Sequence, residues 1–361
     1  MLLAGWVCRC PHPKLCTVTK RIIFFFTVLL FTAGLYVSCK NDPAPVAAQA
    51  AEPGDPQLAT INALLAKDPD NDSLLYRRAA LYYDQQGYDE ALADVSRALQ
   101  LDSLQPQYYH LLADVMLDYG RPNDSRRAIV VLQRASEKFP ERLSTWLKLS
   151  EFQLIVKQHA DALASLNQVL QRNPQSADAF FMTGRVALDM SDTARAIKAL
   201  QRSVQYDAAN PEAWMFLGRI FSNRNDPQAI QYFDNALRVD STNLEAREFK
   251  GAFYKRRGDN TQAFAIYRDI IARNPDYSNA YFDMGLIYLS LDSLSKAYDN
   301  FNIAVKTDPL FVNAYYFRGV ASEAMGNATA ALGDYKQANK MSPGFMEAKE
   351  ARARLEKTQQ Q

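Results

Sequence analysis

The chain has 361 residues, of which 48% are hydrophobic and 22% charged, as in ordinary globular proteins. Its 41 basic and 40 acidic residues nearly cancel, and residues 1–39 hold four of the basic and none of the acidic ones. Without a basic excess to neutralise phosphates, no nucleic-acid partner is expected. No cysteine follows residue 39, which excludes a later disulfide or thiolate metal site; the cysteines are Cys8, Cys10, Cys16 and Cys39.

Residues 1–38 are predicted to be a secretory signal peptide. The basic pair Lys20-Arg21 precedes an uncharged apolar run at 22–37, and the small residue Ser38 follows the run. This run is shorter than the ~20 residues that a membrane-spanning helix needs. Residues 1–17 fit no part of such a signal, which predicts that translation starts downstream of Met1.

The end of the apolar run carries a lipid-attachment signature. Residues 35–39 (LYVSC) resemble a bacterial lipobox, although Tyr36 stands where that motif usually has an aliphatic residue. The resemblance implies that Cys39 receives diacylglycerol; the alternative is an uncleaved anchor with an incidental cysteine. Residues 39–56 contain four prolines among Ala, Asp and Gly, and predict a disordered, lipid-anchored tether.

From residue 72 a pattern recurs about every 34 residues. Residues 143–176 show it fully, with Trp146, then Ala162 sixteen residues later, then Leu166 and a closing Asn173-Pro174. Its apolar spacing is helical rather than alternating. The pattern resembles that of tetratricopeptide repeats, which implies an all-α, right-handed superhelical solenoid of about eight helix–turn–helix repeats over 72–345. Residues 57–71 are expected to form a helix ahead of the repeats, and 346–361 a solvating C-terminal helix and tail.

Each residue type that recurs at a fixed position of this repeat has a packing role. Gly or Ala at the eighth position and Ala at the twentieth let two antiparallel helices approach, while large residues at positions four, eleven and twenty-four fill the space between them. Proline at position 32 ends the second helix. The second repeat has about three extra residues near 121–124 and the fifth lacks one before Pro227, and both changes are expected to fall in turns.

Nothing in the sequence predicts an enzyme. After residue 39 the only histidines are His110 and His159, and no zinc-protease, P-loop, nucleophile-elbow or dinucleotide-binding motif occurs. We therefore expect no catalytic residue, no cofactor and no metal.

In the family resembled, the first helix of each repeat lines a concave groove through positions two, five, nine, twelve and thirteen. Positions five and nine predict a groove that is acidic early, basic in the middle and apolar late. The resemblance thus implies a partner-binding groove formed by Phe181, Arg185, Met215, Arg219, Phe282, Leu286 and Tyr316. The alternative is that these residues only pack on their neighbours. No repeat has the Lys and Asn pair by which some relatives bind chaperone tails.

Five Asp-Ser or Asp-Thr pairs that are followed by an apolar residue or Thr resemble the O-glycosylation motif of some Gram-negative lineages. They are expected in turns between helices, where Asp and Ser also serve as ordinary turn and capping residues. The acceptor residues would be Ser73, Ser103, Thr193, Ser241 and Ser293.

Together these features predict a scaffold or adaptor lipoprotein of the bacterial envelope. It would be held at the outer membrane by its N-terminal lipid alone, facing the periplasm or the surface, and would bind a protein or peptide partner. The alternative is a holdase-like chaperone for exported proteins.

Replacing Cys39 with Ala should abolish lipidation, because the thiol is the acylated group and the chain has no later cysteine. The precursor should stay uncleaved or the protein should become soluble. Labelling cells with radioactive palmitate checks this, and label retained by Cys39→Ala would contradict the lipoprotein assignment.

Overall fold

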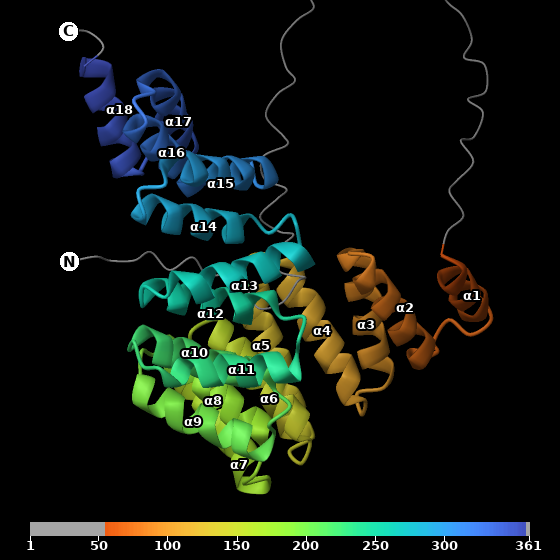
Figure 1. Cartoon of the computed structure of the whole chain (residues 1–361). Coiled ribbons are helices and arrows are strands. Elements are labelled where there is room, and N and C mark those ends of the chain that lie inside the picture. Colours follow the sequence, from red (N-terminus) through yellow and green to blue (C-terminus); the bar gives the residue numbers. More distant parts are fainter. Residues whose placement is uncertain (1–54, 359–361) are drawn as a thin grey trace, which may run out of the picture. The chain divides into compact units, whose positions relative to one another are not determined.

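The computed structural model describes residues 55–358, in which every regular element is an α-helix (Figure 1). The predicted all-α repeat fold is thereby confirmed. The predicted signal peptide, Cys39 and nearly all of the predicted tether lie outside the described residues. Within the described range, no helix has both the length and the apolar character needed to cross a membrane.

Sixteen of the eighteen helices within 55–358 form eight consecutive pairs, in which a first helix A is followed by a second helix B. The pairs are α2 (Asp72–Asp84) with α3 (Tyr88–Leu101), α4 (Pro106–Tyr119) with α5 (Asp124–Lys138), α6 (Leu143–Ile155) with α7 (His159–Arg172), α8 (Ala177–Asp189) with α9 (Thr193–Tyr206), α10 (Pro211–Asn223) with α11 (Gln228–Val239), α12 (Leu244–Arg256) with α13 (Asn260–Arg273), α14 (Ser278–Ser290) with α15 (Leu294–Thr307), and α16 (Val312–Ala324) with α17 (Ala328–Met341). Helix α1 (Pro56–Leu65) precedes them and α18 (Met346–Thr358) follows.

The chain divides into two compact units, Met1–Ser165 and Leu166–Gln361. We call them unit 1 and unit 2. The division falls inside α7, so unit 1 contains the helices from α1 to α6 and unit 2 those from α8 to α18.

Many helix starts follow a polar residue in the turn before the helix, either between repeats or between the two helices of one repeat. The side chain of the residue before the helix accepts a hydrogen bond from a backbone N–H of the first turn, which otherwise has no partner. Eight helices of the described range begin in this way, at Asp55, Asn71, Ser176, Asp192, Asn210, Asn243, Asp259 and Asn327. Proline adds to three starts, at the first residue of α1, of α4 and of α10, where its missing N–H costs nothing.

A close contact within each repeat of unit 2 joins position eight of helix A to position twenty-four of helix B. A Cβ atom added to Gly218 would lie 2.6 Å from the ring of Phe233, and one added to Gly285 would lie 2.6 Å from the ring of Phe301. Gly184, Gly251 and Gly319 make the same approach to Leu200, Tyr267 and Tyr335. The small residue therefore makes room for a large side chain of the partner helix, in addition to the role of the buried alanines at position twenty.

Partly buried arginines paired with buried aspartates connect neighbouring helix pairs near both ends of the array. Arg318 donates to both oxygens of Asp334, at 3.0 and 2.6 Å, and its third nitrogen donates to Asn302 of the preceding repeat at 2.8 Å. Arg78 makes the same set of bonds to Asp94 and to Asn62. Because Asn62 belongs to α1, this helix takes the place of a helix B before the first repeat.

The prediction that the extra residues of the second repeat lie in its turn is only partly right, because two of the three lengthen the helices. Helix α4 has 14 residues where the other A helices have 13, and α5 has 15 where most B helices have 14. The turn between them, 120–123, takes up the remaining residue. In the fifth repeat the loss falls on helix α11, which is shortened to 12 residues because Pro227 stands at its N-cap.

Gly218→Ala should lower stability by about 1–3 kcal/mol, because the added methyl group would press into the buried Phe233 ring. Gly333→Ala is the matched control: it lies in α17 with nothing within 4 Å of an added Cβ atom. There the gain in helix propensity should raise stability by up to about 1 kcal/mol. Unfolding in urea measures both variants, and a shift of the same sign in the two would contradict the proposed contact.

Candidate binding face

The candidate surface consists of the residues at positions five and nine of the A helices in unit 2. We call it the A-face; it comprises Phe181, Arg185, Met215, Arg219, Glu248, Ala252, Phe282, Leu286, Tyr316 and Val320. All of these side chains except Met215 are partly exposed. The register of the repeat therefore places the predicted positions at the surface, while the binding role assigned to them stays a prediction.

Met215 is a correction to the predicted site. It is only 5% exposed and packs with Ala236 and Ala246 in the core. The two alanines leave a gap that an unbranched, flexible thioether fills well. Its neighbour Phe216 is the partly exposed residue that accompanies the arginines, and it lies at position six, outside the positions from which the groove was predicted.

Arg219 lies between two aromatic rings. Its guanidinium carbon is 4.8 Å from the centroid of Phe249 on the next A helix and 5.5 Å from that of Phe216. Both distances are within the range of a cation–π interaction. Among residues 55–358 Arg219 has no carboxylate partner, so its N–H donors point to no acidic group of the described chain.

Arg185 occupies the equivalent position one repeat earlier. Its guanidinium carbon lies 5.9 Å from the ring of Phe181, and Nη1 donates to the sulfur of Met182 at 3.5 Å. The Phe181 and Phe216 rings are 6.0 Å apart, so aromatic rings continue from α8 to α10 beside both arginines. The prediction that Phe181 accompanies Arg185 agrees with this geometry.

Further along the A-face the acidic groups already have partners. Glu248 accepts hydrogen bonds from the hydroxyl of Tyr277 and, at 2.9 Å, from Asn279. Asp283 pairs with Lys255 and accepts from Tyr267. Burial, followed by the charge of Asp283, raises the pKa of Tyr267, which therefore stays a hydrogen-bond donor. Arg219 thus differs from these neighbouring charged residues, which already have hydrogen-bond or ion-pair partners.

The late A-face is less open than the sequence implied. Phe282 packs against three rings, with centroids 4.8 Å away for Phe311, 5.6 Å for Phe301 and 5.7 Å for Phe317. Leu286 packs against the same core. Both residues therefore help to hold α14 to its neighbours, and the binding role predicted for them stays a prediction.

The A helices of unit 1 carry acids and tyrosines. Asp114 pairs with Lys148 at 2.8 Å, and Tyr83 donates to Asp118 at 2.5 Å. Burial raises the pKa of the Asp114 carboxyl. Burial also lowers the pKa of His110 to about 4, so the imidazole, which is bonded to Thr145 at 2.9 Å, is uncharged at neutral pH.

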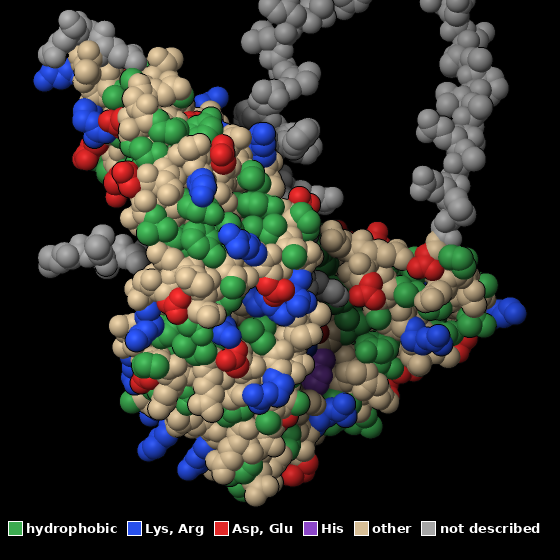
Figure 2. All heavy atoms as spheres, viewed as in Figure 1, with side chains coloured by type: hydrophobic (Ala, Val, Ile, Leu, Met, Phe, Trp, Pro, Cys, Tyr) green, Lys and Arg blue, Asp and Glu red, His purple; other side chains and the backbone are tan. Residues whose placement is uncertain are grey.

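The surface shown in Figure 2 is mixed in character. Hydrophobic side chains gather over α14 and α15, and basic and acidic side chains lie between them. Over residues 55–358, no group of three or more His, Cys, Asp or Glu residues could hold a metal ion.

The five predicted glycosylation residues lie at or next to helix starts. Ser103 and Ser241 are in turns and Ser293 is the N-cap of α15, but Ser73 and Thr193 lie inside the first turns of α2 and α9 rather than between helices. Several of the accompanying aspartates act locally, because Asp102, Asp192 and Asp240 accept from nearby backbone N–H groups. Attachment of a glycan stays a prediction.

Comparison with known proteins identifies the repeat. A family model of the tetratricopeptide repeat matches residues 58–106, 156–189, 181–243, 221–278 and 282–344. A repeat-containing protein of Methanocaldococcus jannaschii is 20% identical over 273 residues, 70% of this chain and 47% of that protein. Hsp70-Hsp90 organizing protein 3 of Arabidopsis thaliana is 21% identical over 240 residues, 66% of this chain and 37% of that protein. The chain therefore spans less than half the length of these relatives.

Among solved structures, the chain is similar to PilW, described as a widely conserved type IV pilus biogenesis factor. The TM-score is 0.51 at 19% identity, with 57% of this chain and 96% of that chain covered. At this identity the likeness concerns the fold.

Replacing Arg318, at position seven of its repeat, should lower stability more than replacing Arg219, at position nine. Arg318→Met would leave Asp334, which is 7% exposed, without its bidentate partner, and should cost about 3 kcal/mol. Arg219→Met should cost no more than about 1 kcal/mol, because only ring stacking is lost. Equal losses on urea unfolding would mean that Arg219 is also structural.

Proposed function

Because the chain belongs to the tetratricopeptide repeat family, whose members generally mediate protein–protein interactions, we propose that it is a non-enzymatic scaffold or adaptor. It binds a segment of a partner protein along the A-face of unit 2. The partner's contact with Arg219 is central to this proposal.

The observation that carries the proposal is the partly exposed guanidinium of Arg219, which has no carboxylate partner within the described residues. Within the described residues, Arg78 and Arg318 instead help to hold the fold together through bidentate bonds to aspartate. The guanidinium carbon of Arg219 lies near the rings of Phe216 and Phe249, and these contacts leave its N–H groups available to a ligand. A carboxylate of a partner, from an acidic side chain or a chain terminus, would complete the paired hydrogen bonds that a guanidinium favours.

The size of the expected affinity follows from the same contacts. A few apolar side chains buried against the A-face would contribute ~1.5–3 kcal/mol each. Ordering the partner segment and losing its translational freedom offset much of that gain. The proposed complex therefore has a dissociation constant on the order of micromolar.

The proposed location is the outer membrane of a bacterial envelope, with Cys39 as the lipid attachment. Its support is the sequence of residues 20–39, with a basic pair, an apolar run and a small residue before the cysteine. In this arrangement the repeats reach a partner in the envelope from a fixed point on the membrane.

A holdase-like chaperone would need an open apolar surface for unfolded chains. The largest aromatic cluster of unit 2, around Phe282, is instead packed on itself. The A-face therefore suits an adaptor that makes defined polar contacts better than it suits a holdase that needs an open apolar surface.

Crosslinking in membranes followed by capture of this protein tests the adaptor. We expect one stoichiometric partner, whose yield falls at least tenfold, and becomes less salt-sensitive, in Arg185→Ala/Arg219→Ala. The matched control is Arg202→Ala/Arg268→Ala, which removes the same charge from two exposed arginines that also stack on rings but lie on B helices. A broad mixture of unfolded client proteins would support the holdase instead. Equal capture of the partner by both double variants would refute binding along the A-face.

A further inference from the structure

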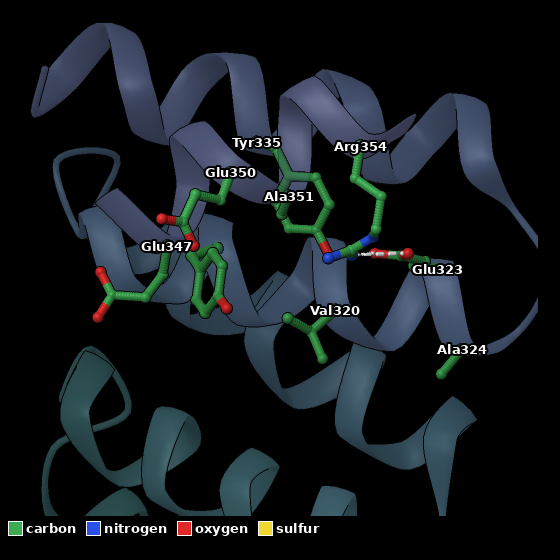
Figure 3. Close-up of a pocket in the computed structure, with 9 residues that line it drawn as sticks. Val320, Glu323, Ala324, Tyr335, Glu347, Glu350, Ala351 and Arg354 are labelled. Carbon is green, nitrogen blue, oxygen red and sulfur yellow. Dashed lines mark hydrogen bonds and ion pairs between the residues drawn. The ribbon is translucent and has the colours of Figure 1, made fainter. Parts of the chain in front are cut away.

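An open pocket of about 480 Å³ lies between the last A helix, α16, and the terminal helix α18 (Figure 3). Tyr316, Val320 and Glu323 of α16 and four residues of α18 line it, with Tyr335 behind them. Its volume is in the range of known ligand pockets. Helix α18 therefore does more than cover the end of the array, because it adds a wall to the A-face.

The two ends of this pocket differ in charge. At one end Arg354 donates to both oxygens of Glu323 at 2.8 Å, and the Tyr335 hydroxyl donates to the same carboxylate at 2.7 Å. At the other end Figure 3 shows Glu347 and Glu350 side by side on α18. Within the described part of the chain, no basic residue pairs with either of them.

Tyr316 supplies an aromatic surface beside these carboxylates. Its ring lines the pocket and is held in place by the rings of Phe345, at 5.0 Å, and Tyr335, at 5.7 Å. Burial, and then the negative charge of Glu347, raise the pKa of Tyr316, so the ring is neutral and can face a cation. Val320, Ala324 and Ala351 line the pocket with apolar atoms on which an aliphatic stem can lie.

We propose that this pocket receives a lysine or arginine side chain of the partner protein, with its cationic end between Glu347 and Glu350 and its stem across Tyr316. Charge decides the occupant: the pocket holds three carboxylates and one guanidinium, and Glu323 already neutralises that guanidinium. An acidic or phosphorylated group would meet two uncompensated negative charges here. This inference rests on the proposed function for the identity of the partner, while the chemistry of the pocket stands by itself.

Small-molecule probes test the pocket without the partner. The purified chain, carrying ¹³C-labelled tyrosine rings, is titrated with the N-acetyl methylamides of lysine, arginine and norleucine, and the Tyr316 resonance is assigned from Tyr316→Phe. We expect saturable shifts with the lysine and arginine derivatives and none with uncharged norleucine. The derivative that saturates at lower concentration identifies the preferred cation. Equal shifts with norleucine would show an apolar pocket and overturn the proposal.

Carboxylate variants give the second arm of this test. Glu347→Gln/Glu350→Gln should weaken binding of the cationic probe at least fivefold. Glu245→Gln/Asp299→Asn removes the same charge from exposed positions on α12 and α15, outside the pocket, and should bind like the unmodified chain. Identical binding by both double variants would overturn the proposal, and unchanged urea unfolding of each variant shows that the fold is intact.

Photocrosslinking to the partner is the third part of this test. A photocrosslinker placed at the exposed pocket residue Ala324 should react with a partner segment that contains Lys or Arg next to the crosslinked site. A crosslinked segment that is acidic, or that comes from a second copy of this chain, would overturn the assignment. If membranes yield no partner at all, the adaptor function fails, while the probe titration still decides whether the pocket binds a cation.

Discussion

The structure of unit 2 depends on one contact, between the glycine at position eight of each A helix and the large side chain at position twenty-four of its B helix. An added Cβ atom would approach that side chain to between 2.6 and 2.9 Å, so the two helices can pair at this distance only if one residue is small. Interiors are packed too densely to absorb the difference. This contact fixes which side of each A helix faces its B helix, and positions five and nine consequently stay toward the surface.

The register set by that contact gives arginine two separate roles. At position seven, in Arg78 and Arg318, the side chain reaches a buried aspartate of its own repeat and an asparagine of the one before. At position nine, in Arg219, it extends over the rings of Phe216 and Phe249. Side chains two positions apart on a helix point in directions that differ by about half a turn. The same residue type therefore stabilises the array at one position and leaves donors for a ligand at the other.

The sequence was sufficient for the helix pairs, because a period of 34 residues and small residues at fixed positions specify them locally. It was not sufficient for details that depend on a neighbouring repeat. Met215 is buried because Ala236 and Ala246 leave a gap beside it, and the ring over Arg219 comes from Phe249 on the next A helix. The terminal pocket was missed for the same reason. Helix α18 was interpreted as a solvating cap from its charged residues, and only the fold brings Glu347 and Glu350 beside Tyr316.

The A-face of unit 2 and the helix α18 beside its last members consequently carry opposite charges at two places. An unpaired cation lies on α10, and two unpaired carboxylates lie on α18, within the described residues. Three A helices, α12, α14 and α16, lie between α10 and α18, and four helix-to-helix steps of about 8–10 Å give a separation of roughly 30–40 Å. An extended chain covers that length with about nine to twelve residues. In the proposed complex, a partner segment with an acidic group at one end and a basic side chain about nine to twelve residues away would match both charged places in one direction only. Reversing it would set like charges against each other, so the two sites together specify the polarity of the bound segment as well as its chemistry.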